Sequence, residues 1–445
     1  MQKDLAFVGK LIVTKKMIKK QIGPMYEEFG SATIDTVTYS NKYHYRAQLS
    51  YEKDPLERGF LSFFFNSKGK VTGFGDGEPS YIYPKAKLTK TAKTAEERIL
   101  SIINEKHLKN STDKFNGSVL VMDQGKEIVK KSFGFSDFEK RTPLNEHTRF
   151  DLASCSKQFT AMAIMILEEQ GKLSYSDNVK KYIPELPYDS ISIEHLLTHT
   201  SGLPSYQRLV NKEWDDKRKY VTNNDIVDLL KEHQPDVIFK PNKSFRYSNT
   251  GYVMLAIIVE RVSGISFANF LAENIFSALG MNDTRVYNTK RSKGELIDNF
   301  AHGYIKDKKS KEYILPDSSD KYNYVIQMDP IVGDGAICSS IHDLALWSKA
   351  SKDFALVDEN SWKKARTKLT FKNGRRLGYG YGLFLRQDEG IEEVVYHTGG
   401  WPGYVTMIIE LPEQEKTVVI LSNNNYRGVL RMADDILITL LTGNE

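Results

Sequence analysis

The sequence has little of what marks several large classes of protein. Only two of its 445 residues are cysteines, Cys155 and Cys338, and they form no CxxC pair, so neither a disulfide framework nor a cysteine-based zinc site is predicted. No stretch reaches the roughly 18 uninterrupted apolar residues that a membrane helix needs. The net charge of +5, from 62 basic and 57 acidic residues, is small and spread along the chain. That distribution argues against nucleic acid as a partner.

The first residues match a secretion signal poorly. MQKDLAFVGKLIVTKK has an apolar run that Lys10 interrupts, and no small-residue cleavage site follows it. The sequence therefore predicts either a cytosolic protein or a processed or trimmed form of an exported one.

Length and composition predict a globular protein with more than one unit. The chain is longer than the roughly 250–300 residues of a single core, and its 40% hydrophobic and 27% charged residues are typical of soluble proteins. A helical pattern over about residues 1–28, followed by four aromatic and β-branched runs, predicts a small α+β domain of the cystatin or nuclear-transport-factor (NTF2) type. It carries no catalytic constellation, so we expect a structural appendage, with docking or substrate gating as the alternative.

A lysine-rich segment, YPKAKLTKTAKTAEER at residues 83–98, has no apolar period and predicts an exposed linker. We therefore expect domains over residues 1–90 and 91–445. In the second domain, a hairpin turns at Asp123-Gln124-Gly125, helical segments dominate residues 154–280, and strand-like runs return after residue 394. This order predicts an α+β fold in which an antiparallel sheet, built from both ends of the domain, is flanked by helices and interrupted by an inserted helical region.

The segment DLASCSKQFTAMAIMILEEQ contains a candidate nucleophile and base. Its apolar residues recur with helical spacing, which places Ser154 at or just before the first turn. Residues three apart on a helix are neighbours, so Lys157 can reach Ser154 but not Ser156. A serine hydroxyl needs a base, and an amine serves when its pKa is depressed. Cys155 is expected to be a small buried filler.

Ser-x-x-Lys alone is a weak signal, since the same spacing follows Ser50, Ser67, Ser111, Ser318 and Ser361. Two further motifs strengthen it. FRYSNTGY presents Tyr247 and Asn249, a phenol that can relay a proton and an amide that can hold a substrate carbonyl. VVYHTGGWPGY ends a predicted strand in a glycine pair, where substrate backbone can approach closely.

Together the three motifs resemble the serine β-lactamase and penicillin-binding-protein superfamily, with its Ser-x-x-Lys, Tyr/Ser-x-Asn and Lys-Thr-Gly set. The segments GKLSYSDNVKKYIPELP, ISIEHLLTHTSGLPSY and FRYSNTGYVMLAIIVERVSGISF are similar to its class C β-lactamase-like branch, which includes D-peptidases and esterases. The resemblance covers roughly residues 95–442 and implies the β-lactamase/transpeptidase-like fold. It also implies an exported protein, of the periplasm or cell surface, that needs no cofactor.

The resemblance implies a role for each motif residue. Ser154 would be acylated, Lys157 would be its general base, and Tyr247 would relay the proton to the leaving group. Backbone N–H groups of Ser154 and Gly400 would form the oxyanion hole. The substrate-binding residues would be Asn249, His397 and Thr398.

Three departures from the branch stand out. His397 replaces the lysine of the penicillin-binding members, and a mostly neutral imidazole lacks the charge that anchors a substrate carboxylate. Asn242 stands where glycine is usual, and Ala278 where proline is usual. We therefore expect a serine hydrolase acting on esters, amides or D-amino-acid peptides, cell-wall fragments among them. The alternatives are a penicillin- or peptidoglycan-binding protein without efficient turnover and a true class C-type β-lactamase.

Two further predictions concern histidines, one on metal binding and one on protonation. His195 and His199 lie one helical turn apart, as zinc ligands can, but no third ligand is evident nearby, so no metal is expected. His397 is expected to gain a proton between about pH 5.5 and 8, in the ordinary range of imidazole.

Overall fold

The computed structural model describes residues 32–41, 44–51, 58–65, 71–75, 94–109, 114–214, 216, 219–307, 309–371, 377–388 and 391–442. The chain divides into two units, Met1–Pro84 with Arg386–Glu393 and Lys85–Leu385 with Val394–Glu445. Each unit is described by itself.

The first unit contains a four-stranded antiparallel meander. Its strands pair in chain order: β1 (Ala32–Asn41), β2 (His44–Tyr51), β3 (Arg58–Phe65) and β4 (Val71–Gly75). All four predicted runs form strands. The helix expected over residues 1–28 and most of the expected linker lie outside the described residues. The cystatin-like or NTF2-like fold and the domain limits at residue 90 stay predictions.

The second unit is built on a six-stranded antiparallel sheet of order β14-β15-β16-β17-β5-β6, apart from Arg386–Glu393 of β14 and β15, which the division above groups with the first unit. The strands are β5 (Gly117–Asp123), β6 (Lys126–Phe133), β14 (Phe384–Asp388), β15 (Ile391–Trp401), β16 (Tyr404–Leu411) and β17 (Lys416–Ser422). Strands β5 and β17 pair in the middle, with Leu120 opposite Val419. The sheet thus joins two ends of the domain, as the sequence predicted. The predicted hairpin turns where Gln124 and Gly125 both have positive φ, 50° and 73°, as a two-residue hairpin turn requires.

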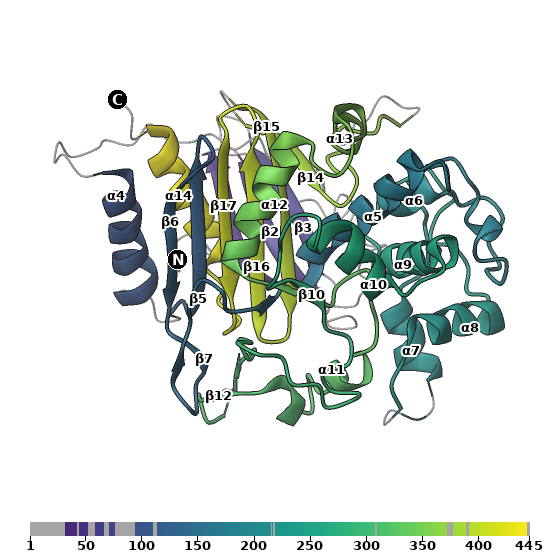
Figure 1. Cartoon of the computed structure of the whole chain (residues 1–445), viewed down its shortest axis with the longest axis horizontal. Helices are drawn as coiled ribbons and strands as arrows, with labels where there is room; N and C mark the ends of the chain where they lie inside the picture. Colours follow the sequence, from purple (N-terminus) through teal and green to yellow (C-terminus); the bar gives the residue numbers. More distant parts are fainter. Residues whose placement is uncertain are drawn as a thin grey trace. The chain divides into compact units, whose positions relative to one another are not determined.

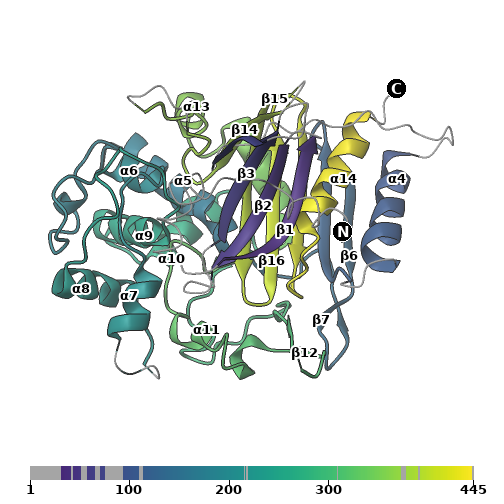
Figure 2. The same cartoon turned by 180° about the vertical axis from the view of Figure 1, so that it is seen from behind.

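Helices cover both faces of this sheet. α12 (Ile341–Asp353) packs on β5, β6 and β17, while α4 (Ala95–Ile102) and α14 (Val429–Thr442) pack together on the other face, as the opposite views of Figures 1 and 2 show. α4 begins with a capping box in which Thr94 and Glu97 bond each other's backbone. The α+β fold class predicted from the sequence is confirmed.

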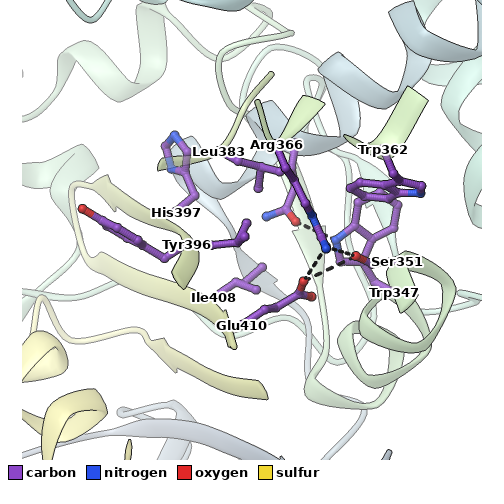
Figure 3. A pocket seen from close by; sticks show the side chains of 11 residues that line it. Trp347, Ser351, Trp362, Arg366, Leu383, Tyr396, His397, Ile408 and Glu410 are labelled. Atoms are coloured by element: carbon purple, nitrogen blue, oxygen red, sulfur yellow. Dashed lines mark hydrogen bonds and ion pairs between the residues drawn. The ribbon is translucent and has the colours of Figure 1, made fainter. Parts of the chain in front are cut away.

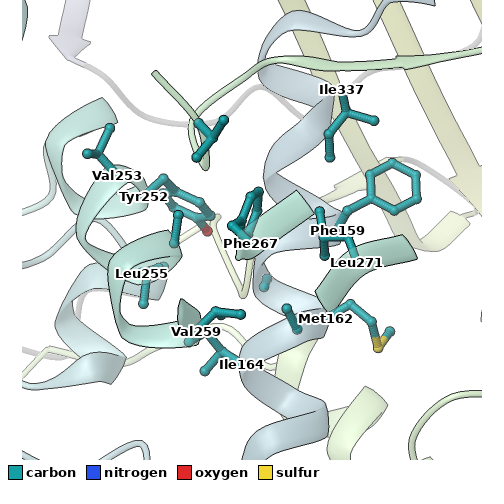
Figure 4. Packing of buried hydrophobic residues seen from close by; sticks show 14 of the residues in the cluster. Phe159, Met162, Ile164, Tyr252, Val253, Leu255, Val259, Phe267, Leu271 and Ile337 are labelled. Atoms are coloured by element: carbon teal, nitrogen blue, oxygen red, sulfur yellow. The ribbon is translucent and has the colours of Figure 1, made fainter. Parts of the chain in front are cut away.

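The predicted helical insertion lies between the two halves of the sheet in the sequence. It contains α5 (Lys157–Glu169), α6 (Ile193–Leu197), α7 (Tyr206–Glu213), α8 (Asn223–His233), α9 (Asn249–Ser263) and α10 (Phe267–Leu271). α5 and α9 are buried along most of their length and pack against each other, with Phe159, Met162, Tyr252 and Phe267 in the shared core (Figure 4). In the described part of the chain no single helix is long and apolar enough to cross a membrane. Among the described residues, one pair, Asn249–Ser263 and Phe267–Leu279, bent by 80°, reaches that length and composition jointly.

Shorter elements complete the unit. β9 (Phe150–Asp151), β13 (Ile337–Ser339) and β10 (Arg285–Val286) form a small antiparallel sheet that leads the chain into α5. The others are β7 (Phe135–Asp137) with β8 (Thr142–Pro143), β11 (Ile305–Lys306) with β12 (Tyr313–Ile314), α11 (Tyr324–Gln327) and α13 (Glu359–Ala365).

Candidate active site

A strained turn presents Ser154 between β9 and α5. Ala153 has a φ of 47°, which is uncommon for a residue with a side chain, and its N–H donates to the Asp151 carboxylate at 2.7 Å. A 3-10 turn over Ala153–Ser156 then continues into α5. Ser154 is partly exposed, whereas Cys155 and Ser156 are fully buried. Of the polar groups in this turn, the Ser154 hydroxyl is therefore the one that a substrate can reach.

Lys157 contacts Ser154 as its spacing predicted. Its Nζ donates to Ser154 Oγ at 3.1 Å and to the backbone carbonyl of Asp334 at 2.6 Å, and the side chain is wholly buried. Burial lowers the pKa of Lys157 from 10.5 to about 8, while the negative charge of Asp334 acts in the opposite direction. About one amine in ten is then neutral at pH 7. A neutral amine at this distance can accept the serine proton.

Tyr247 lies against the same two residues. Its ring stands 5.0 Å from Lys157 Nζ, and its oxygen is buried without a hydrogen-bond partner among the described residues. Burial raises the pKa of the Tyr247 phenol well above 10, although the nearby Ser154 hydroxyl lowers it. The Tyr247 phenol therefore lies near the Ser154 hydroxyl. A buried, protonated phenol can give up a proton only in exchange for another, as a relay does.

Asn249 opens α9 just after Tyr247. Ser248 caps the helix, its hydroxyl accepting from the Gly251 N–H at 3.2 Å. The side-chain oxygen of Asn249 is buried and, like Tyr247 Oη, has no hydrogen-bond partner within the described ranges. Buried polar atoms are nearly always paired. Two unpaired polar atoms on residues so close in the chain are suited to bonding a substrate or water.

Strand β15 passes close to the Ser154 turn. A Cβ on Gly399 would lie 2.2 Å from the Leu152 carbonyl oxygen and 2.1 Å from Thr406 Oγ1, so only glycine fits there. Cys155 Sγ donates to the His397 carbonyl at 3.2 Å. Gly400, which follows Gly399 on β15, is exposed, and there is open space where a Cβ would be. The strand thus carries the backbone of Gly400 along the turn that holds the nucleophile.

His397 is enclosed by protein atoms. Its side chain is 1% exposed, its Nδ1 lies 2.7 Å from the carbonyl oxygen of Thr398, and its Nε2 lies 3.1 Å from Tyr379 Oη. A carbonyl only accepts, so Nδ1 carries the proton and the Tyr379 hydroxyl donates to Nε2. Burial, aided by the charge of Lys157, lowers the pKa of His397 to about 3. The expected titration between pH 5.5 and 8 is therefore wrong, because burial and the charge of Lys157 disfavour a second proton on the ring.

Thr398, the last of the predicted substrate-binding residues, lies on β15 next to His397. Thr398 is partly exposed on β15 and uses its carbonyl to accept from His397. The contact of Asn249, His397 and Thr398 with a substrate, and the oxyanion hole of Ser154 and Gly400, stay predictions.

Sequence reasoning missed Asp334. Its carbonyl accepts from Lys157, and its carboxylate accepts from Tyr206 Oη at 3.0 Å. The pKa of Asp334 is raised, because the effect of burial exceeds the opposing effects of Lys157 and Tyr206. The residue lies between Gly333 and Gly335, far from the three motifs in sequence, and a carbonyl contact leaves no signature in residue type.

A pocket adjoins the other side of β15 (Figure 3). Arg366 donates to Ser351 Oγ at 2.8 Å and pairs with Glu410 at 3.2 Å, and the His397 ring points away from this pair. The charges within this pocket compensate each other. Ser154 is not among the residues that line this pocket, whereas His397 is.

The two histidines considered as metal ligands serve the backbone. His195 Nδ1 accepts from the Ser192 N–H at 3.1 Å, and His199 Nδ1 accepts from the Ser248 N–H at 3.1 Å. The described residues hold no cluster of three or more His, Cys, Asp or Glu side chains placed to bind a metal.

Asn242, which stands where the class C β-lactamase-like branch usually has glycine, has a φ of 59°. Asparagine tolerates this conformation almost as well as glycine does.

Comparison with known proteins places the chain in a family. The Beta-lactamase family model matches residues 104–442. Penicillin-binding protein 4* of Bacillus subtilis (strain 168) is 40% identical over 346 residues, 77% of this chain and 75% of that protein. Among solved structures, the penicillin binding protein from Bacillus halodurans superposes with a TM-score of 0.63 at 27% identity, over 78% of this chain and 99% of that one.

The D-amino acid amidase from Ochrobactrum anthropi SV3 has the same fold, with a TM-score of 0.63 at 22% identity over 78% of this chain and 99% of that chain. The fold and the motif set define the class of serine β-lactamases and penicillin-binding proteins. The chain belongs to the Beta-lactamase family of this superfamily.

Proposed function

We propose that the protein is a serine hydrolase that forms an acyl-enzyme at Ser154 and acts on an ester, an amide or a D-amino-acid-containing peptide. The observation that carries the proposal is the wholly buried Lys157 amine, 3.1 Å from a partly exposed serine hydroxyl. A solvated lysine would be almost entirely charged at neutral pH, whereas this one has its pKa lowered to about 8.

The chemistry follows from these contacts. Neutral Lys157 takes the proton of Ser154 Oγ as that oxygen attacks the substrate carbonyl carbon. The tetrahedral oxyanion accepts from the backbone N–H groups of Ser154 and Gly400. Tyr247 gives its proton to the leaving group and is reprotonated from Lys157, so the leaving group departs neutral and the acyl-enzyme remains. Water, deprotonated by the same pair, then attacks the ester and frees Ser154.

The state of His397 bears on the substrate. Its imidazole is neutral with both nitrogens bonded to protein atoms, so it offers no charge to a carboxylate. Substrates without a carboxylate on the leaving-group side are therefore favoured over penicillins and cephalosporins.

A second candidate is a penicillin-binding protein that acylates without efficient turnover. The 40% identity to Penicillin-binding protein 4* favours it. A β-lactamase proper is disfavoured by the neutral His397.

Covalent labelling tests the proposal. The protein is treated with a fluorophosphonate, and its intact mass and peptide map are compared with those of Ser154→Ala and of Ser361→Ala, a control with the same Ser-x-x-Lys spacing. We expect one adduct on Ser154, kept in Ser361→Ala and lost in Ser154→Ala. Turnover of short-chain esters then separates a hydrolase from a slow acylating binder. Equal labelling of Ser154→Ala would overturn the proposal.

A further inference from the structure

His199 sits beside the loop that carries Tyr247. It follows α6, which packs against α9 (Figure 1), and it adopts a φ of 56°. Its carbonyl accepts from the Arg246 N–H at 3.0 Å, and its Nδ1 accepts from the Ser248 N–H at 3.1 Å. One residue therefore binds the backbone on both sides of Tyr247.

The same imidazole also packs against the Tyr247 ring. Their centroids are 4.3 Å apart, and the ring of Tyr379 lies 4.5 Å away. His199 is wholly buried, and burial, with the charge of Lys157, holds its pKa well below 6.5. Since a backbone N–H only donates, Nδ1 must be unprotonated and Nε2 carries the hydrogen. The ring thus acts as a fixed acceptor.

The neighbouring backbone strengthens this arrangement. Thr200 accepts from the Asn242 N–H at 2.9 Å and Gly202 from the Ile238 N–H at 2.8 Å. A Cβ on Gly202 would lie 2.0 Å from the Phe239 carbonyl oxygen. The turn after α6 is therefore joined along its length to the segment that leads to Tyr247, and His199 is the point of this contact nearest the phenol.

We infer that His199 is a positioning residue that fixes the Tyr247 phenol for proton transfer, by accepting from both flanking N–H groups and packing on the ring. This inference rests on the proposed function. It assigns His199 no contact with substrate. It implies that the acceptor at Nδ1 matters for the proton-transfer step rather than for substrate binding.

Two replacements separate the acceptor from the backbone conformation. Asparagine and glycine both tolerate a positive φ, but only asparagine places an oxygen near the position of Nδ1. His199→Gly should lower kcat for an unactivated alkyl ester by about 10- to 100-fold, part of the roughly 10²–10⁴-fold that a positioned acid or base contributes. KM should change little. His199→Asn should recover most of the loss.

A nitrophenyl ester should be less sensitive to His199→Gly, because its leaving group departs without a proton. In a Tyr247→Phe background the same replacement should have little further effect, since residues acting as one unit are not additive. His107→Asn is the control for loss of a buried histidine, because His107 bonds Tyr426 Oη at 2.7 Å, away from the described site. It should lower the melting temperature and leave kcat near that of the parent.

Failure of the proposed function and failure of the inference on His199 give different results. If Ser154 of the parent is not labelled by the fluorophosphonate, the proposed function fails and the inference with it. If Ser154 is labelled but His199→Gly keeps the parent rate, or loses as much in the Tyr247→Phe background, only the inference fails. Should His199→Gly not fold, His199→Ala takes its place in each comparison.

Discussion

The Tyr379 hydroxyl donates to His397 Nε2 across 3.1 Å, while the other ring nitrogen bonds the Thr398 carbonyl. Under the proposed function, His397 would lie on the leaving-group side of the substrate, and a neutral imidazole offers no cation there. Because His397 carries no positive charge, we expect the protein to select against substrates that have a carboxylate at this position. The charge of the substrate is therefore the property to vary in a test.

His397→Lys should shift selectivity toward carboxylate-bearing substrates. A charge-assisted hydrogen bond is worth roughly 1.5 to 3 kcal/mol, which corresponds to about one to two powers of ten in selectivity. The measurement is kcat/KM for a nitrophenyl ester and for a chromogenic cephalosporin, on parent and variant. Efficient cephalosporin turnover by the parent would mean that another group holds the carboxylate.

The ratio of these two rates should stay constant in the parent between about pH 5.5 and 8, bracketing ordinary imidazole titration. The pKa of His397 is lowered to about 3, so the ring is neutral throughout this range. A rise in relative cephalosporin turnover toward pH 5.5 would show that His397 does protonate there.

The activity itself should depend on pH through Lys157. The base works when neutral, and its pKa is lowered to about 8, so kcat/KM should rise as pH increases toward 8 and level off above it. Below the pKa it should fall about tenfold per pH unit. An ester that hydrolyses slowly without enzyme suits this profile. A flat profile from pH 6 to 9 would remove Lys157 as the titrating base.

Asp334→Asn should move that profile to lower pH. The negative charge of Asp334 raises the pKa of Lys157 against the effect of burial, and asparagine removes the charge while leaving the carbonyl that accepts from Nζ. The half-maximal rate should then occur at a lower pH than in the parent, with a similar plateau. Tyr206→Phe, which removes only the hydroxyl bonded to the carboxylate, is the matched control and should shift the profile less.

Lys157 and Tyr247 should behave as one proton-transfer unit. Lys157→Ala and Tyr247→Phe should each reduce kcat by at least about two powers of ten, and the double variant should lose little more. The measurement is a double-mutant cycle on one ester. Additive losses would indicate that the phenol acts independently of the amine.

The parts of this site that residue spacing encodes were predictable. A lysine three residues after a serine on a helix lies beside it, and strand-like runs at both ends of a domain that flank a helical region are typical of a single sheet with an insertion. Contacts through the backbone were not predictable. The Asp334 carbonyl, the positive φ of His199 and the Tyr379 hydroxyl come from loops whose geometry depends on tertiary packing. The burial of His397, which lowers its pKa to about 3, also depends on this packing, which is why its titration was mispredicted.

The close approach of β15 to the Ser154 turn gives a prediction on stability. In Gly399→Ala the new methyl would overlap Thr406 Oγ1 and the Leu152 carbonyl oxygen, at 2.1 and 2.2 Å. Backbone atoms cannot rotate away, so the strand or the turn must shift, and we expect a loss of about 1–3 kcal/mol in the free energy of unfolding, as in other overpacked sites. The protein that still folds should also lose activity, because the shift separates Gly400 from Ser154. Gly400→Ala, which has open space for its methyl, is the control for stability. Thermal unfolding of both variants checks this, and equal melting temperatures would show that the two segments are less tightly packed than the structure indicates.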